Sequence, residues 1–278
     1  MFAGRTLVLA TKHQKEQVLG PLFEEVLGVR VIVPEDLDTD LLGTFSGEKD
    51  REDDPLTTAK KKCDWALELS GADLALSSEG SFGSHPSLFF LPANEEWLFF
   101  SDRKNGWEIH IRHLSTETNY SHLEFDSWEQ LENFAKQVQF PSHGLILRKA
   151  KKSLEGMSKG IVTWEALKEK AEQLLNAFGK GYAETDMRAH LNPTRMQVIR
   201  EAGEKLLQKI QSLCPACQTP GFGVTNWESG LPCSWCGSPT RSILAEIRTC
   251  GHCSHQERVL FPKGKTEEDP MYCDRCNP

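Results

Sequence analysis

The chain has 278 residues, 38% of them hydrophobic and 26% charged, and its 32 basic and 40 acidic side chains give a net charge of −8. No stretch approaches the roughly 18 apolar residues of a membrane span, and the N-terminus lacks a signal-peptide pattern. We therefore expect a cytoplasmic protein with no membrane partner. The acidic balance argues against a protein that coats itself in nucleic acid, but it leaves room for a local anion site.

Residues 7–33 predict a β-α-β unit. Residues 7–10 form a continuous apolar run typical of a buried strand, and apolar residues from Val18 to Leu27 recur at helical spacing until Gly28 ends the helix. A second β-type run follows at 29–33. We expect two parallel neighbouring strands joined by a right-handed crossover.

The next elements alternate between loops, helices and strands. Residues 34–55 are acidic and turn-rich, and Pro55 opens a helix to about Ser70 with Asp54 as its N-cap. Residues 74–76 predict a strand, and "SSEGSFG" (77–83) predicts a Ser/Gly-rich turn. The sequence 104–106, Lys-Asn-Gly, predicts the turn of a β-hairpin.

Further helices are expected at 127–138, with Ser127 as N-cap, and at 163–178, with Thr163 as N-cap. Residues 143–148 and the start of 180–189 predict strands, with a basic connection at 149–159. Asn192 and Pro193 open a long helix that ends where the cysteines begin. The pattern predicts an α/β domain at 1–212, with a mixed sheet flanked by helices, and a small separate module at 213–278.

Eight of the nine cysteines lie after residue 213 in four Cys-x-x-Cys pairs. In a chain without a secretion signal such pairs favour metal over disulfides, and two of them complete a tetrahedral zinc site. We predict a zinc ribbon with two structural Zn²⁺ ions. Gaps of 15 and 19 residues suit ribbon hairpins and favour sequential pairing, although spacing alone leaves nested or crossed pairing open. The sequential sites would be Cys214, Cys217, Cys233 and Cys236, and then Cys250, Cys253, Cys273 and Cys276.

The purpose of this module is open to two interpretations. Closed Cys₄ sites leave no position for chemistry, which favours a structural role. The alternative is docking to a protein or a nucleic acid. The module has 6 basic and 7 acidic residues, and this balance disfavours nucleic acid.

Polar turns of the first domain follow predicted strands, where α/β folds bind ligands. The first turn contains Thr11, Lys12, His13 and Lys15 at a helix start. Cations there oppose the helix dipole, so their presence indicates an anion such as phosphate. A second, acidic segment has oxygen ligands suited to Mg²⁺, namely Glu48, Glu52, Asp53 and Asp54.

Two more polar segments complete the predicted site. Glu79 follows a buried strand among small residues and could hold a metal or activate water. A last group lies at a strand-to-helix junction, where arginine suits phosphate or a base edge. Its members are Asp186, Arg188, His190, Asn192 and Arg195.

In this order the segments resemble the inosine/xanthosine triphosphate pyrophosphatases, which share an α/β fold with the Maf proteins. The likeness rests on "LVLATKHQK", "DPLTTAKKK", "ADLALSSEGSFG", "EWLFFSDRKNGWEIHI" and "YAETDMRAHLNPTRMQVIREAGEKLL". It implies a cleft that binds a nucleoside triphosphate with Mg²⁺ and cleaves between the α- and β-phosphates. Lys12 and Lys15 would hold phosphate, Asp54 and Glu79 would serve the metal, and Arg195 would help at the base.

The chain departs from that family in four places. His13 replaces its Asn, Glu79 alone replaces its paired acidic turn, Asp54-Pro55 replaces a Glu-Asn dipeptide, and the zinc module has no counterpart. The whole chain, with "TETN", "ETDMRAHLNPTRM" and "CDRCNP", also resembles an uncharacterised bacterial family of the same two-part layout.

The sequence therefore predicts a Mg²⁺-dependent nucleotide-phosphate hydrolase or pyrophosphatase with a structural zinc ribbon. One alternative is a non-catalytic protein that binds nucleotides or nucleic acid. The other is a zinc-stabilised protein-interaction factor.

Overall fold

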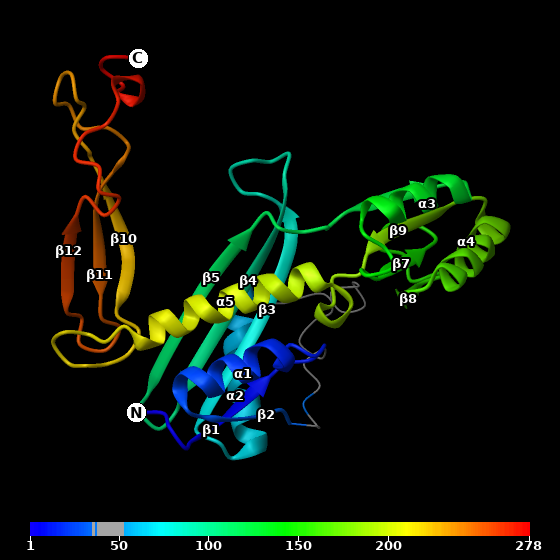
Figure 1. Cartoon of the computed structure of the whole chain (residues 1–278), viewed down its shortest axis with the longest axis horizontal. Helices are drawn as coiled ribbons and strands as arrows, with labels where there is room; N and C mark the ends of the chain where they lie inside the picture. Colours follow the sequence, from blue (N-terminus) through cyan, green and yellow to red (C-terminus); the bar gives the residue numbers. More distant parts are fainter. Residues whose placement is uncertain (35–36, 38–52) are drawn as a thin grey trace. The chain divides into compact units, whose positions relative to one another are not determined.

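The computed structural model describes residues 1–34, 37 and 53–278 (Figure 1). The chain divides into two compact units, Met1–Leu206 and Leu207–Pro278. Within the described residues, no helix combines the length and the apolar composition that a bilayer span requires.

A five-stranded mixed sheet forms the first part of unit 1, in the order β2-β1-β3-β4-β5. Its strands are β1 (Thr6–Ala10), β2 (Arg30–Ile32), β3 (Leu74–Ser84), β4 (Pro92–Asp102) and β5 (Trp107–Ser115). The predicted β-α-β unit is confirmed, because β1 is parallel to β2 and α1 (Glu16–Leu27) connects them. Gly28 ends α1 at φ 66°, a conformation that glycine adopts without strain. The predicted hairpin is confirmed as the antiparallel pair β4–β5.

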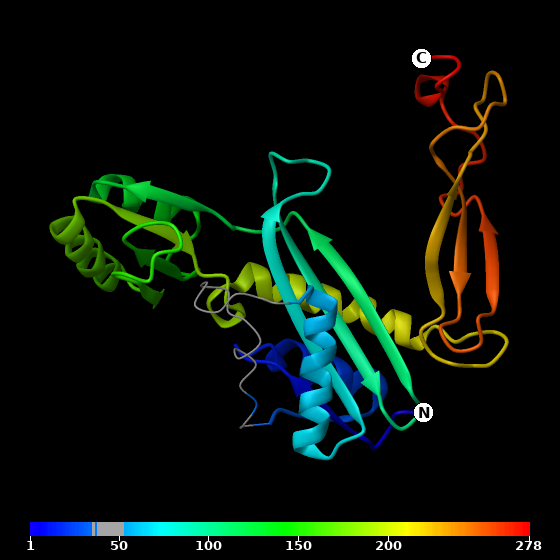
Figure 2. The same cartoon turned by 180° about the vertical axis from the view of Figure 1, so that it is seen from behind.

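Helices cover both faces of this sheet (Figures 1 and 2). On one face, Ala59, Cys63 and Ala66 of α2 (Pro55–Ser70) pack in one buried cluster with Val8 and Phe99 of the sheet. On the other face lie α1 and the start of α5 (Pro193–Gln211). A Cβ on Gly203 would come within 2.8 Å of Leu19, so glycine lets α5 approach α1 closely.

The predicted Ser/Gly turn at 77–83 is wrong, because β3 continues through this segment to Ser84. Residues 77–83 pair with β4 one by one, with Glu79 opposite Trp97 and Gly80 opposite Glu96. Small residues are tolerated in β3 because β4 supplies large neighbours, and Ser77 satisfies its hydroxyl by donating to the carbonyl of Ala59. Tertiary pairing here overrides the turn propensity of serine and glycine.

A second sheet in unit 1 corrects the prediction of a single mixed sheet. It is antiparallel, in the order β6-β9-β7-β8, and β9 therefore lies outside the first sheet. Its strands are β6 (His122–Phe125), β7 (Leu145–Arg148), β8 (Ser158–Ile161) and β9 (Gly181–Thr185). The sequence did not predict β6, and β8 begins inside the predicted basic connection.

Two predicted helices pack on this second sheet, α3 (Trp128–Gln137) and α4 (Trp164–Phe178). Leu131 and Phe134 of α3 share a buried cluster with Leu167 and Leu174 of α4 and with Leu147 of the sheet. The cluster explains why the helical periodicity of both segments was readable from the sequence.

Unit 2 contains a three-stranded antiparallel sheet, β10 (Gly223–Ser229), β11 (Ile243–Thr249) and β12 (Gln256–Leu260). Its buried apolar cluster is small and includes Cys214, Phe222 and Cys250. With so few buried apolar side chains, a unit of this size usually depends on further links such as bound metal.

The two predicted N-caps of α3 and α4 differ in the structure and provide a matched test. The Thr163 side chain accepts a hydrogen bond from Ala166 N, whereas Ser127 caps α3 without a side-chain bond. We expect Thr163→Ala to lower the free energy of unfolding by about 1 kcal/mol. Ser127→Ala should change it by less than about 0.5 kcal/mol. Urea titration measures both, and equal losses would contradict the assigned caps.

Candidate functional site

A buried lysine lies between the end of β1 and the start of α1. Lys15 is the N-cap residue of α1 and only 5% exposed. Its Nζ donates to Ser78 Oγ at 3.0 Å and to the Ser78 carbonyl at 3.3 Å. The last β1–β3 pair is Ala10 with Ser77, so Ser78 is the first β3 residue beyond the end of β1. The site therefore lies at the carboxyl end of a parallel strand, where ligands bind in such sheets.

The surroundings of Lys15 lower the pKa of its amine. Burial, and after it the positive charges of Arg195 and Lys62, lower its pKa from 10.5 to about 7. Glu96 and Glu79 act in the opposite direction. Near pH 7 the Lys15 amine is therefore only partly protonated, because the neighbouring carboxylates do not fully offset its burial and the nearby positive charges.

Two buried ion pairs flank this lysine. Lys62 of α2 pairs with Glu79 of β3, and both side chains are nearly buried. Arg195 of α5 pairs with Glu96 of β4 at 2.8 Å, and both are fully buried. Arg195 also donates to the carbonyl of Met187. Arg195, predicted to help at a base, thus lies inside the protein and joins β4 to the strand-to-helix junction.

Glycine is required beside the Glu96–Arg195 pair. A Cβ on Gly80 would overlap the Arg195 guanidinium and the Glu96 carboxylate. Two residues before Glu96 on β4, Asn94 is fully buried, and neither its amide nitrogen nor its oxygen has a hydrogen-bond partner among the described residues. Water or a ligand normally satisfies such a group.

The β1–α1 turn has an uncommon backbone. His13 and Gln14 both have positive φ, 67° and 60°, which costs of the order of 1–3 kcal/mol per residue and concentrates at functional sites. Thr11 is buried and donates its hydroxyl to the carbonyl of Lys12. The His13 ring stacks on His190 at 5.2 Å. The structure thus brings the first and last predicted polar segments together.

An open pocket of about 350 Å³ borders this turn. Gln14 and Gln17 line it from the turn and α1, and His190, Met196 and Gln197 line it from the junction and α5. Amide, imidazole and thioether groups give the pocket both polar and apolar contact area.

Other predicted residues hold the junction itself. Asp186 is buried and accepts from Gly160 N at 3.1 Å and from Arg188 Nε at 2.9 Å. Asn192 accepts from Arg195 N at 2.9 Å and donates to Asn119. These contacts give Asp186, Arg188 and Asn192 positioning roles within the fold.

The predicted acidic ligands are only partly gathered. Asp54 caps α2 by accepting from Leu56 N and Thr57 N, and the Thr57 hydroxyl hydrogen bond lowers the pKa of its carboxyl. Asp53 pairs with Lys61. Glu48 and Glu52 lie outside the residues that the structure describes.

Three members of the site were not predicted as such, Ser78, Lys62 and Glu96. Glu96 had a readable signal, because it alternates with Leu98 and Phe100 on one side of β4 and so places a carboxylate on a buried face. Lys62 lay within a run of three lysines, and only the helix phase separates it from its exposed neighbours.

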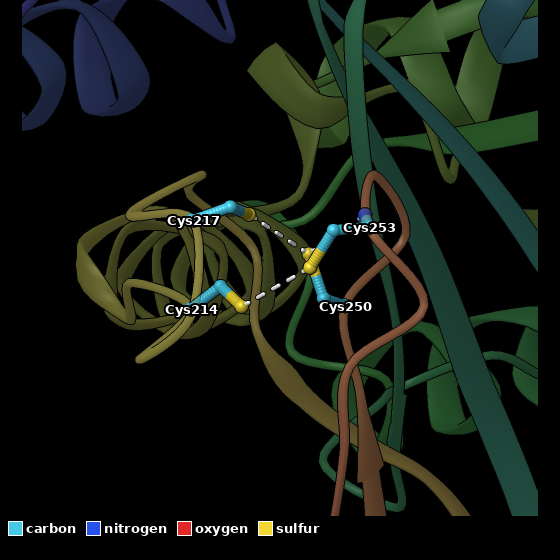
Figure 3. Close-up of side chains that lie close together, drawn as sticks. All are labelled: Cys214, Cys217, Cys250 and Cys253. Carbon is cyan, nitrogen blue, oxygen red and sulfur yellow. Dashed lines mark hydrogen bonds between the residues drawn. The ribbon is translucent and has the colours of Figure 1, made fainter.

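The cysteines form two Cys₄ groups, and their pairing corrects the sequential prediction. One group contains Cys214, Cys217, Cys250 and Cys253 (Figure 3), and the other contains Cys233, Cys236, Cys273 and Cys276. The pairs alternate, first with third and second with fourth.

The sulfur geometry suits tetrahedral metal. Sγ–Sγ distances are 3.7 Å for Cys214–Cys253, 3.6 Å for Cys217–Cys250 and 3.7 Å for Cys236–Cys273. Zn–S bonds of about 2.3 Å in a tetrahedron place sulfurs about 3.8 Å apart. Each group could therefore hold one zinc ion with all four positions filled by cysteine.

Strand direction explains the alternation. Strand β10 separates the first pair from the second, so these pairs lie at opposite ends of the three-stranded sheet. Strand β11 returns the chain to the first end, where the third pair meets the first, and β12 leads toward the fourth. Sequential pairing would require the first and second pairs to meet at one end of the sheet, and β10 holds them at opposite ends.

These features define a mixed α/β protein with a C-terminal double Cys₄ module. The chain belongs to the family described as "Domain of unknown function (DUF6671)", which matches residues 62–278. A comparison with curated proteins gave no match.

Paired cysteine substitutions test the alternating arrangement. Cys214→Ser with Cys250→Ser damages one site and should leave about one zinc ion per chain, because four cysteines still form a closed site. Cys214→Ser with Cys233→Ser damages both sites and should leave almost none. Zinc is measured by elemental analysis after gel filtration. If the Cys214/Cys233 variant kept one zinc ion and the Cys214/Cys250 variant kept none, the pairing would be sequential.

The pKa of Lys15 predicts a pH-dependent stability difference. Between about pH 7 and 10.5 the unfolded chain binds more protons at Lys15 than the folded chain, so its contribution to the free energy of unfolding rises with pH. Lys15→Met removes this contribution. We expect the free energy of unfolding of the variant to exceed that of the parent most at about pH 7. This difference should shrink as the pH rises, by up to about 1.4 kcal/mol per pH unit.

The control is Lys61→Met, which replaces the exposed lysine beside Lys62 in α2. Urea titrations at several pH values provide the comparison. A Lys15→Met difference that stays constant with pH would show that Lys15 titrates normally.

Proposed function

We propose that unit 1 binds a nucleotide or another phosphate-bearing ligand at the β1–α1 turn and hydrolyses a phosphate bond with Mg²⁺. The observation that carries the proposal is the buried Lys15, held between two buried ion pairs next to a strained turn. Burying a cation in this way is costly, and such groups concentrate at functional sites.

Charge supports an anionic ligand. Among the described residues, Lys15, Lys62 and Arg195 face two carboxylates, Glu79 and Glu96. A phosphate near Lys15 would offset the excess positive charge and favour the protonated amine. Lys12 and the start of α1 would add a second cation and backbone N–H groups.

The ITPase/Maf-like fold belongs to the same proposal. Its support is the order of the sequence motifs, together with a parallel β1–β3 pair that continues into an antiparallel hairpin. Glu79 of β3, two residues beyond the last β1–β3 pair, would supply the carboxylate that the resemblance calls for.

Magnesium fits the site only together with the ligand. In the part of the chain that the structure describes, no three carboxylate or histidine groups gather at this turn. Mg²⁺ is often held by one or two carboxylates and by substrate phosphates, and it would neutralise phosphate charge during hydrolysis. Glu79 would contribute the carboxylate, and Lys12 and Lys15 would clamp the phosphates. Asp54 has both oxygens engaged as a cap, which makes it the weaker ligand.

One observation favours a second candidate function, nucleotide binding without turnover. Glu79 is already paired with Lys62, so its carboxylate is less available to a metal. Binding would then tolerate the absence of Mg²⁺ and release neither phosphate nor pyrophosphate.

A thermal-shift screen of zinc-loaded protein against nucleoside mono-, di- and triphosphates, with and without Mg²⁺, tests the proposal. A ligand at 100 times its dissociation constant stabilises the folded chain by roughly 2.7 kcal/mol. We expect a Mg²⁺-dependent rise in Tm, weaker at pH 9 than at pH 6 because the lysine loses its proton above about pH 7. Product release from the ligands that bind separates hydrolysis from binding alone.

Lys15→Met should abolish the shift, and Lys61→Met should keep it. No shift with any phosphate compound would refute the proposal. It would leave the chain as a zinc-stabilised interaction factor.

A further inference from the structure

The alternating cysteine pairs bring two exposed aromatic side chains to one end of unit 2. Trp235 directly precedes Cys236 and Tyr272 directly precedes Cys273, and the two sulfurs lie 3.7 Å apart. Trp235 is 80% exposed and Tyr272 is 58% exposed, and Met271 beside it is 59% exposed. We name these three residues the aromatic surface.

The backbone beneath the aromatic surface is well fixed. Ser234 N donates to the carbonyl of Glu268, and Glu268 N donates to the carbonyl of Pro232, so the two segments run side by side. The Glu268 carboxylate accepts from Ser242 Oγ and Asp269 N, and the Asp269 side chain accepts from Met271 N. The rings are therefore presented to solvent by an ordered frame and not by a loose loop.

Exposed Trp, Tyr and Met side chains on an ordered frame are typical of binding surfaces. Tryptophan and tyrosine dominate interface hot spots, and methionine adapts to varied partners. No packing requirement within the unit explains an 80% exposed tryptophan.

The charge around the aromatic surface selects the kind of partner. Residues 263–275 carry four carboxylates and three basic side chains. Zinc with four thiolates would add a formal charge of −2 at this end. Arg241, another cation of this unit, is paired with Asp274, so three carboxylates remain beside three basic side chains. The metal site would then supply the net negative charge at this end, which repels a phosphate backbone and attracts a cation.

We propose that the aromatic surface docks an arginine-bearing segment of a partner protein. Trp235 and Tyr272 offer ring faces to guanidinium groups, which cation–π attraction holds at such sites. Met271 offers apolar contact to the aliphatic stems of arginine side chains. This inference does not depend on the phosphate site of unit 1.

Fluorescence anisotropy with the zinc-loaded full chain tests the proposal. The probe is a short fluorescein-labelled peptide of alternating arginine and leucine. The matched peptide carries citrulline, the neutral isostere, at every arginine, and a third probe is a single-stranded RNA of similar length. We expect the arginine peptide to bind at least about tenfold more tightly than either of the others.

Variants locate the site. Trp235→Ala and Trp235→Leu should each weaken the arginine peptide by about tenfold, and Tyr272→Ala by about threefold. Trp227→Ala removes another exposed tryptophan, 56% exposed on β10, and should change affinity less than about twofold. Zinc content confirms that each variant keeps its fold, and Trp235→Leu keeps apolar volume if the alanine variant loses zinc.

Three results would overturn the proposal. Equal binding of arginine and citrulline peptides would remove the cation requirement. Preference for RNA would assign the surface to nucleic acid. Arginine-peptide binding that survives both Trp235 variants would place it elsewhere.

Discussion

The buried pair Glu96–Arg195 is the interaction on which the arrangement of unit 1 depends. It joins the middle of β4 to the first turn of α5, and these residues lie far apart in the sequence. Arg195 also holds the carbonyl of Met187, so the pair anchors the junction after β9 as well. Removing one partner of such a pair leaves an uncompensated buried charge and typically costs 3–5 kcal/mol. The position of His190 beside the β1–α1 turn follows from this anchor.

The same pair shapes the environment of Lys15. Arg195 lowers the pKa of that lysine and Glu96 raises it, and the Lys62–Glu79 pair repeats the opposition from α2. Charges on both faces of the sheet thus act on one amine at the end of β1. A ligand that changes the charge at this point would alter the electrostatic interactions of α2, β3, β4 and α5 together, because each supplies one charged side chain beside Lys15.

Much of the fold was readable from the sequence where local signals were strong. Helical periodicity and caps located α1, α2, α4 and α5, and Asn105-Gly106 located the β4–β5 hairpin. The predictions from sequence failed where pairing with a strand distant in the sequence determines the local structure. Ser77 and Gly80 are strand residues only because β4 pairs with them, and β6 exists because β9 pairs with it.

The candidate sites follow the same rule. The types and number of metal ligands could be predicted because Cys-x-x-Cys is a local signal. Their pairing could not, since sequential and alternating arrangements use the same spacings and only the three-stranded sheet separates them. Lys15 was identified by its place at a helix start, but its burial and its contact with Ser78 depend on the length of β3.

The alternating cysteine groups have a consequence for how unit 2 assembles. Each group closes a chain loop, 214–253 or 233–276, and the two loops share residues 233–253. Closing one loop shortens the effective length of the other, and a shorter loop has a lower entropic cost of closure. The first metal ion to bind would therefore lower the entropic cost of closing the second loop, by about a few tenths of a kcal/mol. A chain that already holds one ion would therefore bind the second slightly more tightly than an empty chain binds the first.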